Sequence, residues 1–255
     1  MRTALFAVLG LVVGSFLTVV VHRVPRKESV VSPRSRCPRC GTELRARDNV
    51  PVISWVLLRG RCRACGEPIP PEYPLLELAT AGLFAAASLV YERVLVAALI
   101  AVLLGLLLAL GAIDARHRVV PNAITYPALL GLAIALLAGD LAGGGVDVLD
   151  GLIGLAAYAG PLFLLALLVP GGMGMGDVKL AALIGLVLGS LGLRYVAVAA
   201  GLGILAGGVG GIVAMAVLRY GRKQTIPYGP YLAAGGVGAA LFGAPIARAY
   251  LSLLG

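Results

Sequence analysis

Long apolar stretches separated by short polar breaks make up most of this 255-residue chain. An α-helix needs roughly 20 mostly apolar residues to cross the hydrocarbon core of a bilayer, and eight stretches approach that length. They cover approximately residues 3–22, 74–91, 94–113, 121–138, 148–169, 177–193, 195–218 and 228–253. The pattern therefore predicts an all-α polytopic membrane protein with about eight transmembrane helices.

One polar interruption is far longer than the others. It divides the chain into a first transmembrane helix (1–22), a small insert (23–73) and a seven-helix membrane domain (74–255). We expect the first helix to be retained rather than cleaved as a signal peptide, because only Met1 and Arg2 precede its apolar run and no small-residue cleavage site precedes HRVPR.

Composition and charge support a membrane protein and orient it. Charged residues make up 13% of the chain, about half the share in a soluble domain. With the N-terminus outside, 17 Lys and Arg residues fall on the inner side and 4 on the outer side, in agreement with the positive-inside rule. Dropping the short span 177–193 would move the basic segment RYGRKQ outside, so the span is kept. The net charge of +9 is assigned to contact with anionic membrane lipid, not to nucleic-acid binding.

All four cysteines lie in the insert, as CPRCG and CRACG. Cys37, Cys40, Cys62 and Cys65 form two CxxC pairs, each followed by a glycine that can adopt a left-handed conformation. Two such turns supply four thiolates for one tetrahedral zinc ion and leave no open position for a catalytic water. Disulfides and redox thiols are the alternatives, but the charge count places the insert in the cytoplasm, where disulfides rarely persist. A cytoplasmic, structural zinc-binding insert is predicted.

Three of the twelve acidic residues are predicted within or beside inner membrane boundaries: Glu77, Asp114 and Asp177. Asp114 ends the third span and Asp177 begins the sixth, so the two intervening crossings return the chain to the same face. Two carboxylates that share a proton can hydrolyse a peptide, one activating water while the other polarises the carbonyl. The alternatives are that Asp177 only caps a helix and that Asp114 is a solvated acid paired with a neighbouring arginine.

Glycines and one lysine surround Asp177. Gly171, Gly172, Gly174 and Gly176 carry no side chains that would block an extended peptide, so substrate is expected to lie there. Lys179 either extends to lipid phosphates or biases the aspartates electrostatically. Glu77 either bonds a neighbouring helix or takes part in methyl transfer or amine binding, which makes it the one candidate for cofactor binding. Gly203, Gly207 and Gly211 predict close helix packing.

The motifs together resemble one family over nearly the whole chain. They are GSFLTVVVHRVPR, the cysteine insert, IDARHRVVPN, GGMGMGDVKL and IPYGPYLAAG. In this order they resemble the bacterial type IV prepilin peptidases, a family of GxGD aspartyl proteases. Thr18 departs from the family pattern, where Asn is expected.

The resemblance implies an aspartic-type endopeptidase of the bacterial cytoplasmic (inner) membrane. Such an enzyme removes the short basic leader of prepilins or pseudopilins after a glycine, for type IV pili, type II secretion or DNA uptake. Asp114 and Asp177 fall on the family's catalytic aspartates. The resemblance also implies N-methylation of the new N-terminus with S-adenosylmethionine, an activity associated with the insert, although the insert has no glycine-rich nucleotide loop.

Other classes of function were weighed against this interpretation. A proton-coupled transporter would use the two carboxylates as proton carriers, but such proteins tend to contain internal repeats and none is evident. A zinc-organised scaffold would make both aspartates dispensable. A zinc protease is not expected, because the sequence contains no HExxH. Oligomeric state is left open.

Overall fold

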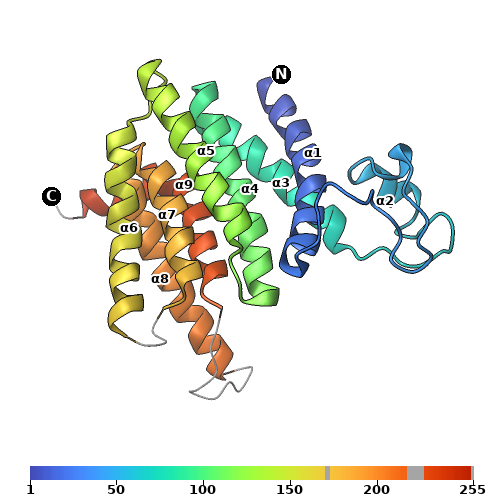
Figure 1. The fold of residues 1–255 in the computed structure, drawn as a ribbon. Coiled ribbons are helices and arrows are strands. Elements are labelled where there is room, and N and C mark those ends of the chain that lie inside the picture. Colours follow the sequence, from blue (N-terminus) through green and yellow to red (C-terminus); the bar gives the residue numbers. More distant parts are fainter. Residues whose placement is uncertain (170–172, 217–226, 254–255) are drawn as a thin grey trace. The chain divides into compact units, whose positions relative to one another are not determined.

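A computed structural model describes residues 1–169, 173–216 and 227–253. In the described residues the chain is helical, with only isolated β-bridges in the insert. The α-helices in Figure 1 are α1 (Arg2–Arg23), α2 (Ile53–Leu57), α3 (Glu72–Val90), α4 (Val94–His117), α5 (Asn122–Leu141), α6 (Val148–Leu168), α7 (Met175–Gly189), α8 (Leu193–Ala216) and α9 (Gly229–Ser252). The predicted all-α class with a cysteine insert after the first helix is confirmed.

Seven of these helices are long and apolar enough to cross a membrane: α1, α3, α4, α5, α6, α8 and α9. The eighth predicted span corresponds to α7, which has 15 residues and is about 22 Å long at 1.5 Å per residue. Its length is less than the roughly 30 Å of a bilayer core. Residues 217 and 218 of the predicted span 195–218 lie outside the described residues.

The chain forms two compact units, Met1–Leu89 and Val90–Gly255. In the first unit, α1 and α3 approach closely at two glycines of α1. A Cβ atom added to Gly10 would lie 2.6 Å from the Ala81 Cα atom, and one on Gly14 would lie 2.8 Å from the Glu77 Cα atom. Small residues thus let the two helix backbones meet, as in many membrane helix pairs. The insert, including α2, belongs to the same unit.

In the second unit, α7 is the central helix and contacts α4, α5, α6, α8 and α9. Figure 1 shows it between α6 and α9. Residues 180–190 are all buried, so neighbouring helices rather than lipid cover most of its length. Glycine again allows the contact, because a Cβ atom on Gly154 of α6 would lie 2.5 Å from the Gly185 carbonyl oxygen of α7.

Glycines of α8 were predicted to mediate close packing, and the structure confirms this for two of them. A Cβ atom on Gly203 would lie 3.5 Å from Leu232, and one on Gly207 would collide with the Tyr228 ring. For Gly211, no atom of the described residues lies within 4 Å of such a Cβ atom.

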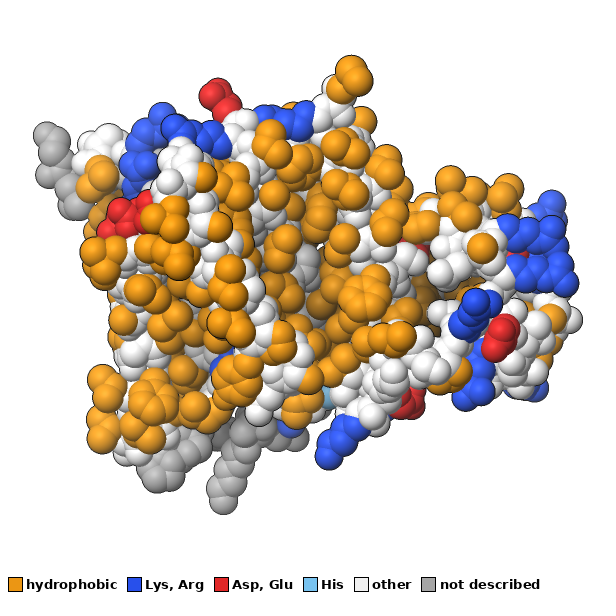
Figure 2. Space-filling model, turned by 45° about the horizontal axis from the view of Figure 1, so that its top comes forward, with side chains coloured by type: hydrophobic (Ala, Val, Ile, Leu, Met, Phe, Trp, Pro, Cys, Tyr) orange, Lys and Arg blue, Asp and Glu red, His pale blue; other side chains and the backbone are white. Residues whose placement is uncertain are grey.

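Apolar side chains cover much of the helical surface shown in Figure 2. On α1 they recur with helical spacing, as Leu5, Val8, Leu9, Val12 and Phe16, and each is more than 45% exposed. An apolar stripe of this kind is expected to face lipid. Lys and Arg side chains gather on the insert and along the top of the helical part in this view (Figure 2).

Candidate active site and metal centre

Asp114 lies in the last turn of α4 with only 7% of its surface exposed. The Gly229 N–H group, at the start of α9, donates a hydrogen bond of 3.1 Å to its Oδ2 atom. The helix continues past the predicted end at residue 113 and stops where Arg118 adopts a left-handed conformation, with φ 55° and ψ 37°.

Asp177 occupies the first turn of α7, half-buried. The helix N-cap is Gly174, so the alternative in which Asp177 itself caps the helix is wrong. Its N–H group donates to the Gly174 carbonyl oxygen over 3.0 Å, and a Cβ atom on Gly174 would lie 3.1 Å from the Asp177 Oδ2 atom. An acid in a first helical turn is also favoured by the helix dipole. Gly171 and Gly172 lie outside the described residues.

The fold of the second unit brings these two carboxylates together. They are close enough to interact electrostatically. Asp114 comes from the end of α4, Asp177 from the start of α7, and Gly229 from the start of α9. Three segments far apart in the sequence therefore meet around the acidic pair.

Lys179 links the start of α7 to the start of α5. Its Nζ atom donates to the Val120 carbonyl oxygen (3.4 Å) and to the Asn122 Oδ1 atom, and lies 5.7 Å from the centre of the Tyr126 ring. Gly176 packs on the same segment, because a Cβ atom there would lie 2.9 Å from a Val120 methyl carbon. The two predicted support residues thus contact the turn that follows Asp114.

Gly229 and Tyr228 were not singled out as site residues from the sequence. A Cβ atom on Gly229 would lie 2.5 Å from the Asp114 Oδ2 atom, so only glycine fits there without displacement. Tyr228 interacts electrostatically with Asp177. The sequence analysis used IPYGPYLAAG only for the family resemblance, and only the three-dimensional structure places Tyr228 and Gly229 beside the aspartates.

The four cysteines form a cluster in the insert. Their Sγ atoms all lie within 4.8 Å of one another, and those of Cys37 and Cys65 are 3.8 Å apart. A tetrahedral zinc centre with Zn–S bonds of about 2.3 Å requires sulfurs about 3.8 Å apart, so the thiols present fit such an ion. Hydrogen bonding to Thr42 lowers the pKa of Cys40 to about 6, which favours the thiolate that metals bind.

Two similar turns build this cluster. The Gly41 N–H group donates to the Cys37 carbonyl oxygen, and the Gly66 N–H group donates to that of Cys62, each over 2.9 Å. Both glycines have a positive φ, 73° and 72°, which favours glycine. The CxxCG spacing therefore encodes the turn as well as the ligands.

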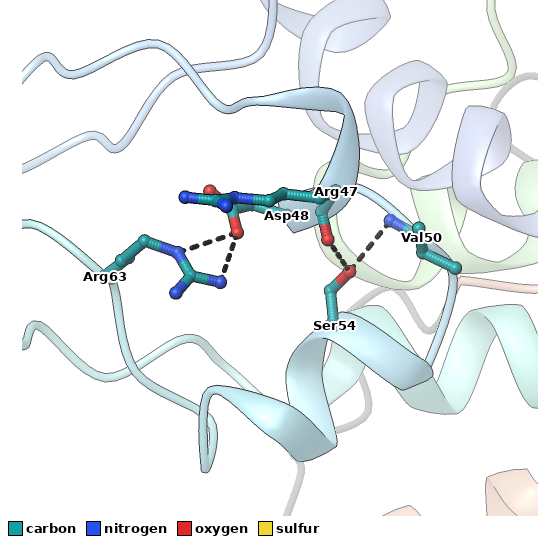
Figure 3. Close-up of polar contacts among 5 residues, drawn as sticks. All are labelled: Arg47, Asp48, Val50, Ser54 and Arg63. Carbon is teal, nitrogen blue, oxygen red and sulfur yellow. Dashed lines mark hydrogen bonds and ion pairs between the residues drawn. The ribbon is translucent and has the colours of Figure 1, made fainter.

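Side-chain contacts also hold segments of the insert together beside the cysteine turns (Figure 3). Arg63 donates twice to the Asp48 Oδ1 atom, over 2.7 and 2.9 Å, and this contact lowers the pKa of the Asp48 carboxyl. Ser54 accepts from the Val50 N–H group and donates to the Arg47 carbonyl oxygen, each over 2.9 Å. The Asp48–Arg63 contact thus joins the segment before α2 to the second cysteine turn, and the Ser54 bonds join α2 to that segment.

Glu77 is buried on α3, with 8% of its surface exposed. Its Oε2 atom accepts a hydrogen bond of 2.7 Å from the Val52 N–H group of the insert. The predicted alternative of a bond to a neighbouring helix is therefore replaced by a bond to insert backbone. Thr18, the departure from the family pattern, donates to the Ser15 carbonyl oxygen over 2.7 Å.

Two families match the chain in succession. The family described as "Bacterial Peptidase A24 N-terminal domain" matches residues 8–91, and the "Type IV leader peptidase family" matches residues 101–215. The junction between these matches agrees with the division of the structure into two units.

Similar proteins carry the name "Prepilin leader peptidase/N-methyltransferase". One from Burkholderia pseudomallei (strain 1026b) is 38% identical over 96% of this chain and 87% of its own length. One from Pseudomonas aeruginosa is 35% identical over 97% of this chain and 92% of its own length, and one from Myxococcus xanthus is 52% identical over 50% of this chain and 38% of its own. No solved structure matches. By family match and by relatives that align along nearly its whole length, this chain belongs to the type IV leader peptidase family.

Proposed function

We propose that this chain is an aspartyl endopeptidase of the bacterial inner membrane that removes the basic leader from prepilin or pseudopilin substrates after a glycine. The observation that carries the proposal is the convergence of Asp114 and Asp177, with the Gly229 N–H group bonded to one of them. Relatives named prepilin leader peptidases supply the substrate class.

The mechanism follows from two like charges held close together. Such a pair shares one proton, because both carboxylates cannot readily ionise at short range. The ionised carboxylate takes a proton from water, and the water oxygen attacks the scissile carbonyl carbon while the protonated carboxyl donates to the carbonyl oxygen. The tetrahedral intermediate then collapses, the amide nitrogen receives a proton, and the C–N bond breaks.

Substrate binding is assigned to the glycine break before Asp177. Gly174 is exposed and half-buried Gly176 packs on Val120, so the backbone is accessible on one side and supported on the other. Lys179 holds this turn against the start of α5. An extended leader lying along Gly174 would present its scissile bond to the two acids.

The same protein is proposed to N-methylate the new N-terminus with S-adenosylmethionine, as the names of its relatives indicate. Bound S-adenosylmethionine would supply the methyl group to the new terminal amine, and Glu77 is the one residue that the sequence offers to hold it. Zinc is assigned to the four cysteines in a structural role, because four thiolates fill its coordination sphere.

Membrane orientation is also part of the proposal. The N-terminus is placed outside, and the insert and both aspartates on the cytoplasmic side, because 17 of 21 Lys and Arg residues then face inward. In this arrangement the basic leader of the substrate and the aspartate pair share one side of the membrane.

The test is leader removal from a prepilin-like substrate, followed by mass. Wild-type protein is compared with Asp114→Asn and Asp177→Asn, which preserve shape and prevent ionisation. Asp150→Asn, in the first turn of α6, is the matched control. We expect cleavage by wild type and the control, and a loss of roughly a thousandfold or more in both site variants. Cleavage by either site variant at the control rate would refute the proposal.

A further inference from the structure

The short helix α2 of the insert has its polarity reversed relative to a helix that faces water. The residue that it buries is polar Ser54, with 6% of its surface exposed. Its aliphatic residues Ile53, Val56 and Leu57 are instead 57%, 60% and 75% exposed. A helix on a water-exposed surface turns its aliphatic side chains inward and its polar side chains outward, and exposed apolar patches mark contacts with protein or membrane. The outer face of α2 therefore suits an apolar environment.

The first unit places the start of α2 below the membrane boundary of its two long helices. The charged residues Arg23, at the end of α1, and Glu72, at the start of α3, mark that boundary, since charges are costly inside a bilayer. Glu77 lies about 7–8 Å further along α3, at 1.5 Å per residue. Its Oε2 atom accepts a hydrogen bond of 2.7 Å from the N–H group of Val52, the residue before α2. The chain thus passes below the boundary before α2 begins.

Packing against α1 indicates a similar depth. Asn49 and Pro51, just before α2, line a hollow together with Val12 and Phe16 of α1. Phe16 lies about 10 Å along the helix from Arg23, at 1.5 Å per residue. Val12 and Phe16 belong to the exposed apolar stripe of α1 that is expected to face lipid. The segment that leads into α2 therefore adjoins a lipid-facing surface.

Hydrogen bonds return the chain from α2 to the boundary. The Trp55 Nε1–H group donates to the Ile69 carbonyl oxygen over 3.1 Å, and the Ile69 N–H group donates to the Gly60 carbonyl oxygen over 2.7 Å. Ile69 comes shortly before Glu72, the first residue of α3. The segment thus enters and leaves the boundary within a short stretch, as expected for a helix that lies about 5–10 Å deep in the interface.

Arginines flank this apolar segment on both sides. Arg45 and Arg47 precede it, Arg59 and Arg61 follow it, and all four are exposed. Long basic side chains reach from apolar surroundings to the phosphates at a membrane interface, and anionic lipid attracts them. Apolar residues between basic residues are typical of a segment that lies in the membrane surface.

We propose that residues 50–57 lie among the acyl chains nearest the headgroups, in the leaflet that contains the end of α1 and the start of α3. The flanking arginines contact the lipid phosphates, and on the proposed orientation this is the cytoplasmic leaflet. The partner is the lipid bilayer, because lipid is the medium around two membrane-crossing helices at this depth. Lipid thus covers the apolar face of α2 and fixes the cysteine turns close to the membrane surface. This contact involves the insert alone and does not depend on peptidase activity.

Trp55, the single tryptophan of the chain, reports the position of α2 without a label. Purified full-length protein is reconstituted in vesicles whose phosphatidylcholine carries bromine either near the headgroup or near the end of one acyl chain. We expect bromine near the headgroup to quench the Trp55 fluorescence by at least half. Bromine near the chain end should quench it at least twofold less, and aqueous iodide should have little effect.

A charged variant of the exposed face tests what holds the segment there. The double variant Val56→Glu/Leu57→Glu is compared with Val31→Glu, because Val31 is 86% exposed in a different loop of the insert. We expect the double variant to lose at least half of the quenching by bromine near the headgroup and to gain at least threefold in iodide quenching. The control should match wild type. Bound metal per chain is measured on each protein, because retained metal shows that the insert has folded.

Three results would overturn the assignment to lipid. Wild-type fluorescence that iodide quenches and neither brominated lipid changes would place α2 in water. Protection from iodide and from both brominated lipids would show that protein, including a second copy of this chain, covers the apolar face. Unchanged quenching by brominated lipid in a metal-loaded double variant would show that Val56 and Leu57 do not hold the segment in the bilayer.

Discussion

Replacing Gly229 by alanine tests how Asp114 is held. The new Cβ atom would lie 2.5 Å from the Asp114 Oδ2 atom, 2.9 Å from Cγ and 3.1 Å from a Leu180 methyl carbon. Contacts under 3.0 Å cannot persist, so the carboxylate must move and the 3.1 Å hydrogen bond from Gly229 must lengthen or break. A hydrogen bond to a charged group contributes about 1.5–3 kcal/mol, which corresponds to a loss of about 10- to 150-fold in kcat/KM.

The assay is the initial rate of leader removal at several substrate concentrations. Gly131→Ala is the matched control, since a Cβ atom on Gly131 of α5 meets no atom of the described residues within 4 Å. We expect the control to cleave at the wild-type rate. In Gly229→Ala, kcat should fall by a larger factor than KM changes. If folded Gly229→Ala protein cleaves within twofold of wild type, the hydrogen bond has no part in catalysis and the argument fails.

Three further perturbations have defined expectations. Lys179→Met should lower leader cleavage about tenfold, and Lys179→Arg should recover part of it, because the amine joins α7 to Val120 and to Asn122 at the start of α5. Equal rates in all three proteins would contradict this role. Cys40→Ser should abolish the metal bound per chain and shift the fluorescence of Trp55, the single tryptophan of the chain; retained metal would exclude Cys40 as a ligand. Gly154→Leu should destabilise the protein by at least about 1–3 kcal/mol in thermal unfolding. Gly160→Leu should not, because a Cβ atom there meets no atom of the described residues within 4 Å, and equal melting temperatures would contradict the close α6–α7 contact.

Hydrophobic pattern predicted the helices well but not their ends. Span 94–113 continues as helix to His117, because polar residues after the apolar run still favour helix until Arg118 turns left-handed. Span 177–193 ends at Gly189, three residues before Gly192 reverses the chain at φ 122°. Hydropathy measures preference for lipid, whereas the helix end depends on backbone conformation. This difference matters here because both aspartates lie at such ends.

The candidate site also has parts that the sequence predicts and parts that only the structure reveals. The cysteine cluster could be predicted because CxxCG supplies both ligands and turn within a few residues. The meeting of Asp114 and Asp177 followed from counting crossings. Gly229 could not be found from sequence, since it lies 115 residues from its partner in the chain.

The central claim is that Asp114 and Asp177 act as one catalytic pair, and a double-mutant cycle on single-turnover leader cleavage tests it most directly. Residues that act as a unit are strongly non-additive, so each asparagine variant and the double variant should retain the same residual rate. A double variant whose loss equals the product of the two single losses would show independent roles and would contradict the shared-proton mechanism.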